Sequence, residues 1–279
     1  MQVIDRRSAG SARVAIVGGI HGDEPAGERI VRQLAAELDE RPDEAEPAGD
    51  DTETGLIRLI IANEPALDAG VRYTDTDLNR AFPGDTNSDE YERALAPQVA
   101  EAVRGMDAVL AIHTSHSAPP PFAIYSELTD SVRRTVAGMP VDYVVDSGAL
   151  RSTTLDSVID HTVSVEVGRQ GSEEAVEFGY EAALAFLRAH GVLDDEPPTF
   201  TETTLVEGFE EVPKGGGDPH VHYANFEEIP QGAVFAHDDV YTHHVEEEGI
   251  VPILASEHGY EDIFGIYGRV RGTLDPPEE

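Results

Sequence analysis

The chain has 279 residues, with 19 Lys or Arg against 55 Asp or Glu, and its formal net charge is −36. This excess of carboxylates argues against nucleic acid and anionic membranes as partners, and it is typical of proteins adapted to concentrated salt. The lack of cysteine excludes disulfides, thiolate catalysis and Cys-based zinc fingers, whereas a hydrophobic content of 40% is enough for a sizeable core.

The N-terminal segment gives no sign of export. Residues 1–17 are polar, contain several arginines and carry no apolar stretch of the length found in secretion signals. No later run approaches the roughly 18 apolar residues that cross a membrane. The expected location is therefore the cytoplasm.

Strand-like runs and helical patterns alternate along the first part of the chain. Strands are predicted over 13–17, 56–62, 107–112, 122–125, 143–145 and 162–167, and helices are predicted to begin near Pro25, Asn87 and Ser172. An acidic loop is predicted over 40–54, and Pro97 predicts a kink or a break in the second helix. This alternation is typical of an α/β fold with a mostly parallel sheet flanked by helices.

Helical periodicity disappears after an acidic, proline-containing segment near residue 196. Beyond it only short β-like runs remain, over 233–235, 250–254 and 263–267. The predicted organisation is a catalytic domain over 1–195, a linker over 196–204 and a small C-terminal β domain over 205–279.

The segment His21-Gly22-Asp23-Glu24 follows a predicted strand and opens a predicted helix. It therefore lies at the edge where the carboxyl ends of parallel strands form a crevice. His113 ends another predicted strand, and two His with one Glu are a known catalytic zinc set that leaves one position for water. Two alternatives stay open: a helix cap with an exposed His21, and His116 in place of His113 as the third ligand.

Glu166 interrupts the apolar strand 162–167. An unpaired carboxylate would be costly there, so it should either face a metal or pair with an arginine. Beside zinc it would act as the general base that takes a proton from the attacking water and passes it to the leaving amine. The alternatives are a solvent-facing side chain and an ion pair with Arg169.

Two arginines, Arg72 and Arg80, stand close together in a chain that has few cations. Arginine binds carboxylates through two parallel hydrogen bonds and also stabilises oxyanions. Both arginines are therefore candidates for binding an acidic substrate, unless they pair with aspartates of the same loop (Asp75, Asp77 or Asp85).

Five motifs follow one another along the chain: Gly18 to Glu24, Ala62-Asn63, Arg72 to Arg80, Ile112-His113 and Val165 to Gly168. Together they resemble the aspartoacylase and succinylglutamate desuccinylase family, a branch of the zinc carboxypeptidase fold. The segment from Val251 to Glu261 is similar to the C-terminal β domain of that family, which lends a tyrosine to the pocket. The resemblance implies a zinc carboxypeptidase-like α/β fold and hydrolysis of a small N-acyl amino acid.

The resemblance also implies a role for each site residue. His21, Glu24 and His113 would hold one Zn²⁺ per chain, and Glu166 would be the base and proton shuttle. Arg72 would polarise the scissile carbonyl, Asn79 and Arg80 would bind the carboxylate of the amino-acid product, and Tyr260 would close on the substrate.

One position departs from the family pattern. Aspartoacylases carry an arginine about ten residues before the catalytic glutamate, which binds the acidic side chain of acetylaspartate, whereas this chain has Thr154-Leu155-Asp156 there. Arg151 could take over that role, as could Arg169, which stands where aspartoacylase has a proline. The motifs therefore leave the amino acid and the acyl group open.

Two other functions fit the same residues: a zinc carboxypeptidase that cleaves peptides, and a non-catalytic homologue that binds a metal or a carboxylate. A compact C-terminal domain over the pocket argues against peptides because it limits substrate size. Homo-oligomerisation is left open. Late histidines at irregular spacing among acidic residues are predicted to lie in surface loops rather than to form a second metal site; they are His220, His222, His237, His243, His244 and His258.

Overall fold

The computed structural model describes residues 1–8, 10–40, 55–117 and 120–277, so nearly all of the predicted acidic loop over 40–54 lies outside the described residues. The described helices are α1 (Pro25–Glu40), α2 (Glu64–Ala69), α3 (Tyr91–Val103), α4 (Asp130–Gly138), α5 (Leu155–Val158) and α6 (Glu173–Ala189), with a 3₁₀ turn η1 (Leu78–Arg80). None of these helices is both long and apolar enough to cross a membrane.

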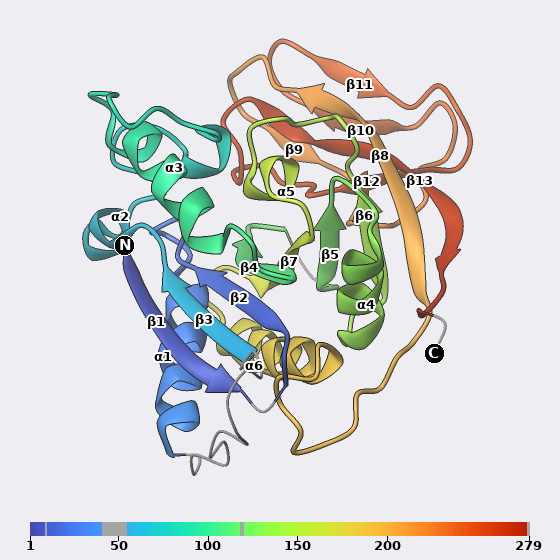
Figure 1. The fold of residues 1–279 in the computed structure, drawn as a ribbon. Coiled ribbons are helices and arrows are strands. Elements are labelled where there is room, and N and C mark those ends of the chain that lie inside the picture. Colours follow the sequence, from blue (N-terminus) through green and yellow to red (C-terminus); the bar gives the residue numbers. More distant parts are fainter. Residues whose placement is uncertain (9, 41–54, 118–119, 278–279) are drawn as a thin grey trace, which may run out of the picture.

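Within the described residues, ten strands form one large sheet with the order β1-β3-β2-β4-β7-β5-β6-β8-β13-β12 (Figure 1). They are β1 (Gln2–Ser8), β2 (Arg13–Gly18), β3 (Gly55–Ile61), β4 (Ala108–Ser115), β5 (Phe122–Tyr125), β6 (Tyr143–Asp146), β7 (Thr162–Arg169), β8 (Thr203–Pro213), β12 (Ile250–Ile253) and β13 (Ile263–Leu274). The central β3, β2, β4 and β7 run parallel to one another, β5 pairs antiparallel with β7, and further antiparallel pairs lie toward both edges. The predicted mixed, mostly parallel sheet is confirmed.

After the exposed Arg13, strand β2 is apolar because both of its faces are covered. Val14 and Ile16 belong to the core that includes α1 and α6, whereas Ala15 and Val17 belong to the core that includes α3. Successive side chains of a strand point to opposite faces, so a strand between two helical layers needs an unbroken apolar run. The predicted arrangement of helices flanking the sheet is therefore also confirmed.

The C-terminal strands extend the same sheet. β8 pairs in parallel with β6 and antiparallel with β13, so the chain beyond the predicted linker is hydrogen-bonded to the part before it. A small sheet of β9 (His220–Val221), β10 (Val234–His237) and β11 (Thr242–His244) lies beyond these strands (Figure 1). Phe235 of β10 packs in one cluster with Val212 of β8 and Phe264 of β13. The division into domains 1–195 and 205–279 stays a prediction.

Helix α3 differs from its prediction at two points. It begins at Tyr91 rather than near Asn87, and it continues through Pro97, so the predicted break is absent while the predicted kink stays a prediction. Proline has no N–H, so the carbonyl of Arg93 lacks its helical donor. The N–H of Asp85 donates to that carbonyl at 2.8 Å. The loop before the helix thus satisfies the group that the proline leaves free.

Candidate metal centre

His21 and Glu24 lie on the turn that joins β2 to α1, and this turn passes very close to α2. A Cβ atom at position 22 would lie 2.0 Å from the carbonyl carbon of Ala66, so only glycine fits there. The N–H of Gly22 donates to the carbonyl of Arg72 at 3.2 Å, which ties the turn to the loop over 72–80. The glycine of the motif therefore fixes where its histidine and glutamate lie.

His113 and Glu166 come from adjacent parallel strands. β4 pairs with β7, and His113 lies opposite Glu166 in that register. Residues in register project to the same face of a sheet, so the two side chains are neighbours. Since β2 lies on the other side of β4, the turn that follows β2 reaches the same place.

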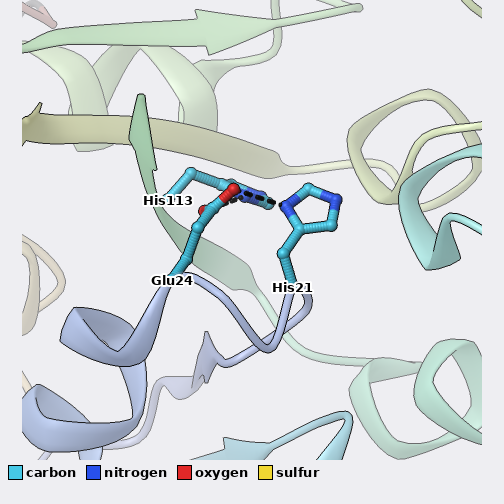
Figure 2. Close-up of side chains that lie close together, drawn as sticks. All are labelled: His21, Glu24 and His113. Atoms are coloured by element: carbon cyan, nitrogen blue, oxygen red, sulfur yellow. Dashed lines mark hydrogen bonds and ion pairs between the residues drawn. The ribbon is translucent and has the colours of Figure 1, made fainter. Parts of the chain in front are cut away.

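The three predicted ligands converge. His21 Nδ1 lies 2.7 Å from Glu24 Oε1, and His113 Nδ1 lies 3.3 Å from Glu24 Oε2 (Figure 2). One ligand atom from each residue lies within 4.8 Å of the others, and all three residues are buried. Because His21 is only 3% exposed, the alternative of an exposed cap histidine does not hold. His116 is exposed and stands outside this group.

The donor set fits a divalent cation. Two imidazoles and a carboxylate are a known ligand set for catalytic zinc. His113 Nε2 is buried and has no hydrogen-bond partner in the described residues, and the same holds for Glu166 Oε2. Buried polar atoms are normally satisfied, so an unpartnered pair beside a ligand cluster indicates a missing binding partner. Glu24 is further fixed by the N–H of Thr114, which donates to its Oε2 at 3.0 Å.

The histidines and the carboxylates of the candidate metal centre stabilise one another's charged forms. Burial disfavours the charged form of His21, but Glu24 and Asp77 outweigh burial and raise the pKa of His21 to about 9. Burial also acts to raise the pKa of Glu24, yet the two histidines hold it well below its usual range. Glu24 therefore stays ionised while buried, which is the form in which a carboxylate binds a metal.

Glu166 has a different environment from Glu24. Burial raises the pKa of Glu166 to about 7, because the opposing influence of His113 only partly offsets it. Glu166 is 8% exposed, so it does not face solvent, and Arg169 is exposed and forms no ion pair with it in the described residues. A carboxyl group that titrates near neutral pH can both accept and return a proton.

Arg72 is held between two carboxylates. Its Nε donates to Asp77 Oδ2 at 3.0 Å, and one terminal nitrogen donates to Glu24 Oε1 at 3.2 Å. Asp77 Oδ1 also lies 3.0 Å from His21 Nε2. The expected alternative of a loop ion pair is therefore present for Arg72, but that pair belongs to the metal centre.

The remaining predicted residues line one cavity with the metal centre. Asn79, Arg80 and Tyr260 all border it, and the guanidinium carbon of Arg72 lies 5.9 Å from the centre of the Tyr260 ring. Arg80 donates to the carbonyl of Asn79 at 2.8 Å and forms no ion pair in the described part of the chain. Burial raises the pKa of Tyr260, so its phenol stays protonated. The structure brings all eight predicted residues to one place, and their roles stay proposals.

Sequence reasoning missed Glu92, which organises the loop over 72–80. Glu92 is fully buried in α3, and its carboxylate accepts the N–H groups of Thr74, Asp75 and Thr76 at 2.7, 3.0 and 3.2 Å. Its side chain lies on the apolar face of α3, three residues before Leu95. An acidic residue within an apolar helical stripe is the signal that could have identified it.

Sequence reasoning also gave no role to Asp156, which lines the cavity together with Ser164. Of the two arginines considered as replacements, Arg151 lines the cavity but its Nε lies 2.5 Å from Glu211, and exposed Arg169 does not line it. The signal for Asp156 was its position, since it stands where the family pattern has an arginine.

The sequence matches known proteins over its first two thirds. The family model of the succinylglutamate desuccinylase/aspartoacylase catalytic domain matches residues 11–189. An N-acyl-aromatic-L-amino acid amidohydrolase (carboxylate-forming) B of Danio rerio is 27% identical over 178 residues, 56% of this chain and 54% of that protein. A succinylglutamate desuccinylase of Yersinia pseudotuberculosis is 31% identical over 157 residues, 53% of this chain and 43% of that protein. The chain thus spans about half the length of the curated relatives that it matches.

The fold is similar over almost the whole chain to a solved structure. A succinylglutamatedesuccinylase/aspartoacylase from Rhodobacter sphaeroides superposes with a TM-score of 0.72 at 20% identity, covering 96% of this chain and 89% of that one. This likeness confirms the predicted fold. Since the family model covers more than half of the sequence, the chain belongs to the succinylglutamate desuccinylase/aspartoacylase family.

Proposed function

We propose that this protein is a zinc-dependent amidohydrolase that removes the acyl group from a small N-acyl amino acid. The observation that carries the proposal is a buried carboxyl group with an unpartnered oxygen, Glu166, beside the cluster of His21, Glu24 and His113. Membership of a family that contains desuccinylases and aspartoacylases supports the reaction class.

His21, Glu24 and His113 would hold the zinc ion. When bound, zinc supplies Lewis-acid activation of a water molecule and of the substrate carbonyl. Glu24 is already ionised, which suits it to bind a divalent cation, whereas His21, whose pKa is raised to about 9, would give up its proton as the cation binds.

Glu166 moves the proton. Its carboxylate takes a proton from the attacking water, whose oxygen forms a bond to the carbonyl carbon of the amide. As the carbon–nitrogen bond breaks, Glu166 passes the proton to the amine nitrogen, so that the acid and the free amino acid leave. Burial favours the protonated form of Glu166, which suits the group to hold the proton until the amine nitrogen takes it.

Arg72, Asn79 and Arg80 bind and orient the substrate. Two nitrogens of Arg72 are engaged by Asp77 and Glu24, which leaves its other terminal nitrogen to donate to the carbonyl oxygen as negative charge develops there. Arg80, a cation without an ion pair in the described residues, would bind the carboxylate of the amino acid together with the amide of Asn79. Tyr260 would cover the bound substrate.

The shape of the cavity favours a small substrate over a peptide. Leu254, Tyr260 and Ile266 of the C-terminal region contribute to its wall. These side chains restrict the room for residues on either side of a peptide bond. A zinc carboxypeptidase that cleaves peptides is therefore the second candidate function. A non-catalytic homologue is the third candidate, because a protein that only binds a metal does not need Glu166.

The test measures amine release by the zinc-loaded protein from N-acetyl and N-succinyl amino acids and from a hexapeptide, in concentrated KCl. We expect hydrolysis of acyl amino acids, little hydrolysis of the peptide, and loss of activity with a chelator that is restored by zinc. Faster cleavage of the hexapeptide would favour the carboxypeptidase. A protein that binds one zinc per chain but releases no amine would favour the non-catalytic homologue.

A further inference from the structure

Apart from the general base, the cavity wall carries one cation and one carboxylate that form no ion pair in the described residues. Arg72 is paired with Asp77 and Glu24, and Arg151 is paired with Glu211. Among the described residues that line the cavity, this leaves Arg80 without an anionic partner and Asp156 without a cationic one. A substrate that fits such a cavity carries both a negative and a positive group.

Asp156 is held in place by neutral groups only. The hydroxyl of Ser126 donates to its Oδ2 at 2.6 Å, and the hydroxyl of Ser164 donates to its Oδ1 at 3.2 Å. Hydroxyl donors orient a carboxylate but leave its net charge in place, and a half-buried charge gains from an opposite charge nearby. The carboxylate is thus fixed at the cavity wall with its charge available to a ligand.

Asp156 lies between Glu166, which would transfer the proton, and Asn79, which would bind the carboxylate. Ser164 and Glu166 are two residues apart on β7 and therefore project to the same face, so Asp156 is anchored beside the base. On its other side, the N–H of Leu155 donates to Asn79 Oδ1 at 3.0 Å. The Cα atom of a bound amino acid, with its nitrogen toward Glu166 and its carboxylate toward Asn79, would have its side chain near Asp156.

We infer that the enzyme selects N-acyl amino acids whose side chain carries a positive charge, and that Asp156 is the residue that recognises this charge. The inference rests on the proposed deacylation at this site. Arg80 and Asn79 bind the α-carboxylate, and Asp156 accepts a hydrogen bond from the side-chain ammonium or guanidinium. An acidic side chain placed at the same point is repelled by Asp156, because Arg151 is neutralised by Glu211.

If Asp156 had only a structural role, its replacement would have a different effect on substrate binding. Asp156 stands in the first turn of α5 and links it to Ser126 and Ser164, so its replacement could simply loosen this region. Asp156→Asn keeps an oxygen that accepts from one serine and removes the charge. A structural role would change the binding of charged and neutral substrates alike, whereas charge recognition changes their ratio.

The experiment compares three ligands that differ in side-chain charge: Nα-acetylornithine, N-acetylnorleucine, in which a methyl group replaces the ammonium, and N-acetylglutamate. Dissociation constants are measured by calorimetry at one KCl concentration on zinc-loaded Glu166→Gln protein, which holds the ligand without cleaving it. The same parent protein carries Asp156→Asn or, as matched control, Asp160→Asn. Asp160 is exposed and lies outside the cavity, and its replacement removes the same charge.

We expect the parent protein to bind Nα-acetylornithine at least about 10-fold more tightly than N-acetylnorleucine, the range of a hydrogen bond between charged groups. Asp156→Asn should bring this ratio close to one, and Asp160→Asn should leave it unchanged. Equal binding of the two ligands by the parent protein, tightest binding of N-acetylglutamate, or a ratio that survives Asp156→Asn would overturn the inference.

Hydrolysis by the wild-type protein separates this inference from the proposed function. Amine release from N-acetylnorleucine and N-acetylglutamate without a preference for Nα-acetylornithine would refute charge selection and leave deacylation standing. Preferred binding of Nα-acetylornithine without release of amine from any of the three ligands would support charge selection and refute deacylation.

Discussion

Histidines cluster in two regions of the molecule. In one region the rings share a carboxylate, and in the other they stack on one another. In the metal centre, His21 and His113 share one buried carboxylate, Glu24, which lies within 2.7 Å of one ring and 3.3 Å of the other. The two rings lie 5.2 Å apart, between centroids, and are tilted by 51°. The ring nitrogens of the two residues therefore face a common anion.

On the small sheet, His220, His222 and His237 stack instead. The centroid of the His237 ring lies 4.9 Å from that of His220 and 5.1 Å from that of His222, and the nearest nitrogens of His222 and His237 are 3.0 Å apart. His220 and His222 are exposed. Among the described residues, only the metal centre brings three ligand atoms within 4.8 Å. Of the two clusters, only the one with a shared buried carboxylate offers the ligand geometry of a candidate metal site.

Replacement of one ligand tests this difference most directly and has the largest expected effect. His113→Ala leaves two ligands, so the protein should lose its zinc and its turnover of acyl amino acids. His222→Ala combined with His237→Ala should leave one zinc per chain, as measured by elemental analysis of the purified protein. Two zinc ions per wild-type chain, or loss of zinc from the double variant, would show that the stacked histidines bind metal.

Glu166→Gln keeps the shape of the side chain and removes its capacity to accept a proton. We expect kcat to fall by a factor of about 100 to 10,000, the range for loss of a general base, with the zinc content unchanged. The measurement is single-turnover hydrolysis together with metal analysis. A variant that retained wild-type kcat would show that another group takes the proton.

Arg72 and Arg80 are predicted to affect different kinetic constants. Arg72→Ala removes a donor to the developing oxyanion, so kcat should fall by a factor of about 100 to 1,000. Arg80→Ala removes a group that binds the carboxylate in substrate and transition state alike, so KM should rise with little change in kcat. Arg72→Ala also removes a partner of Glu24, so its zinc content is the control. An unchanged KM in Arg80→Ala would refute the carboxylate-binding role.

His190 shows what burial does to a histidine that forms no ion pair in the described residues. Burial, reinforced by Arg134, lowers the pKa of His190 to about 4, whereas His21 is raised to about 9. Because the unfolded chain takes up this proton near pH 6.5 and the folded protein does not, the free energy of unfolding should fall as the pH drops from 6.5 toward 4. The loss is up to about 1.4 kcal/mol per pH unit.

The variant that tests this pH dependence is His190→Gln. Its side chain can still hydrogen-bond to Thr135, the partner of His190 at 2.8 Å. Its denaturation midpoint should depend less on pH than that of the wild type within this window. Parallel curves for the two proteins would mean that His190 contributes no such linkage.

The sequence predicted the elements whose pattern is local. The buried parallel strands read as apolar runs because both of their faces are covered, and the turn from His21 to Glu24 was recognisable because its ligands are three residues apart. β1 was missed because it is an edge strand of half-buried and exposed residues, with the charged Asp5, Arg6 and Arg7 in its middle.

The features that sequence reasoning missed depend on distant partners. Glu92 acts on the loop over 74–76, 16 to 18 residues before it, and nothing in α3 itself reveals that partner. The charge balance of the cavity depends on Glu211, 60 residues after Arg151. The position of Asp156 in the family pattern is visible in the sequence. That Asp156 is the charged group available to a ligand follows only from the structure, in which Glu211 neutralises Arg151.

The pairing of β6 with β8 determines how the chain can be divided. β6 is bonded along one side to β5 and along the other to β8, so removal of the residues after the predicted linker would expose an unpaired strand edge. Such an edge pairs with other chains and promotes aggregation. A shortened protein ending at residue 202 should therefore be poorly behaved in solution, because it would lack the hydrogen bonds that β8 supplies to β6.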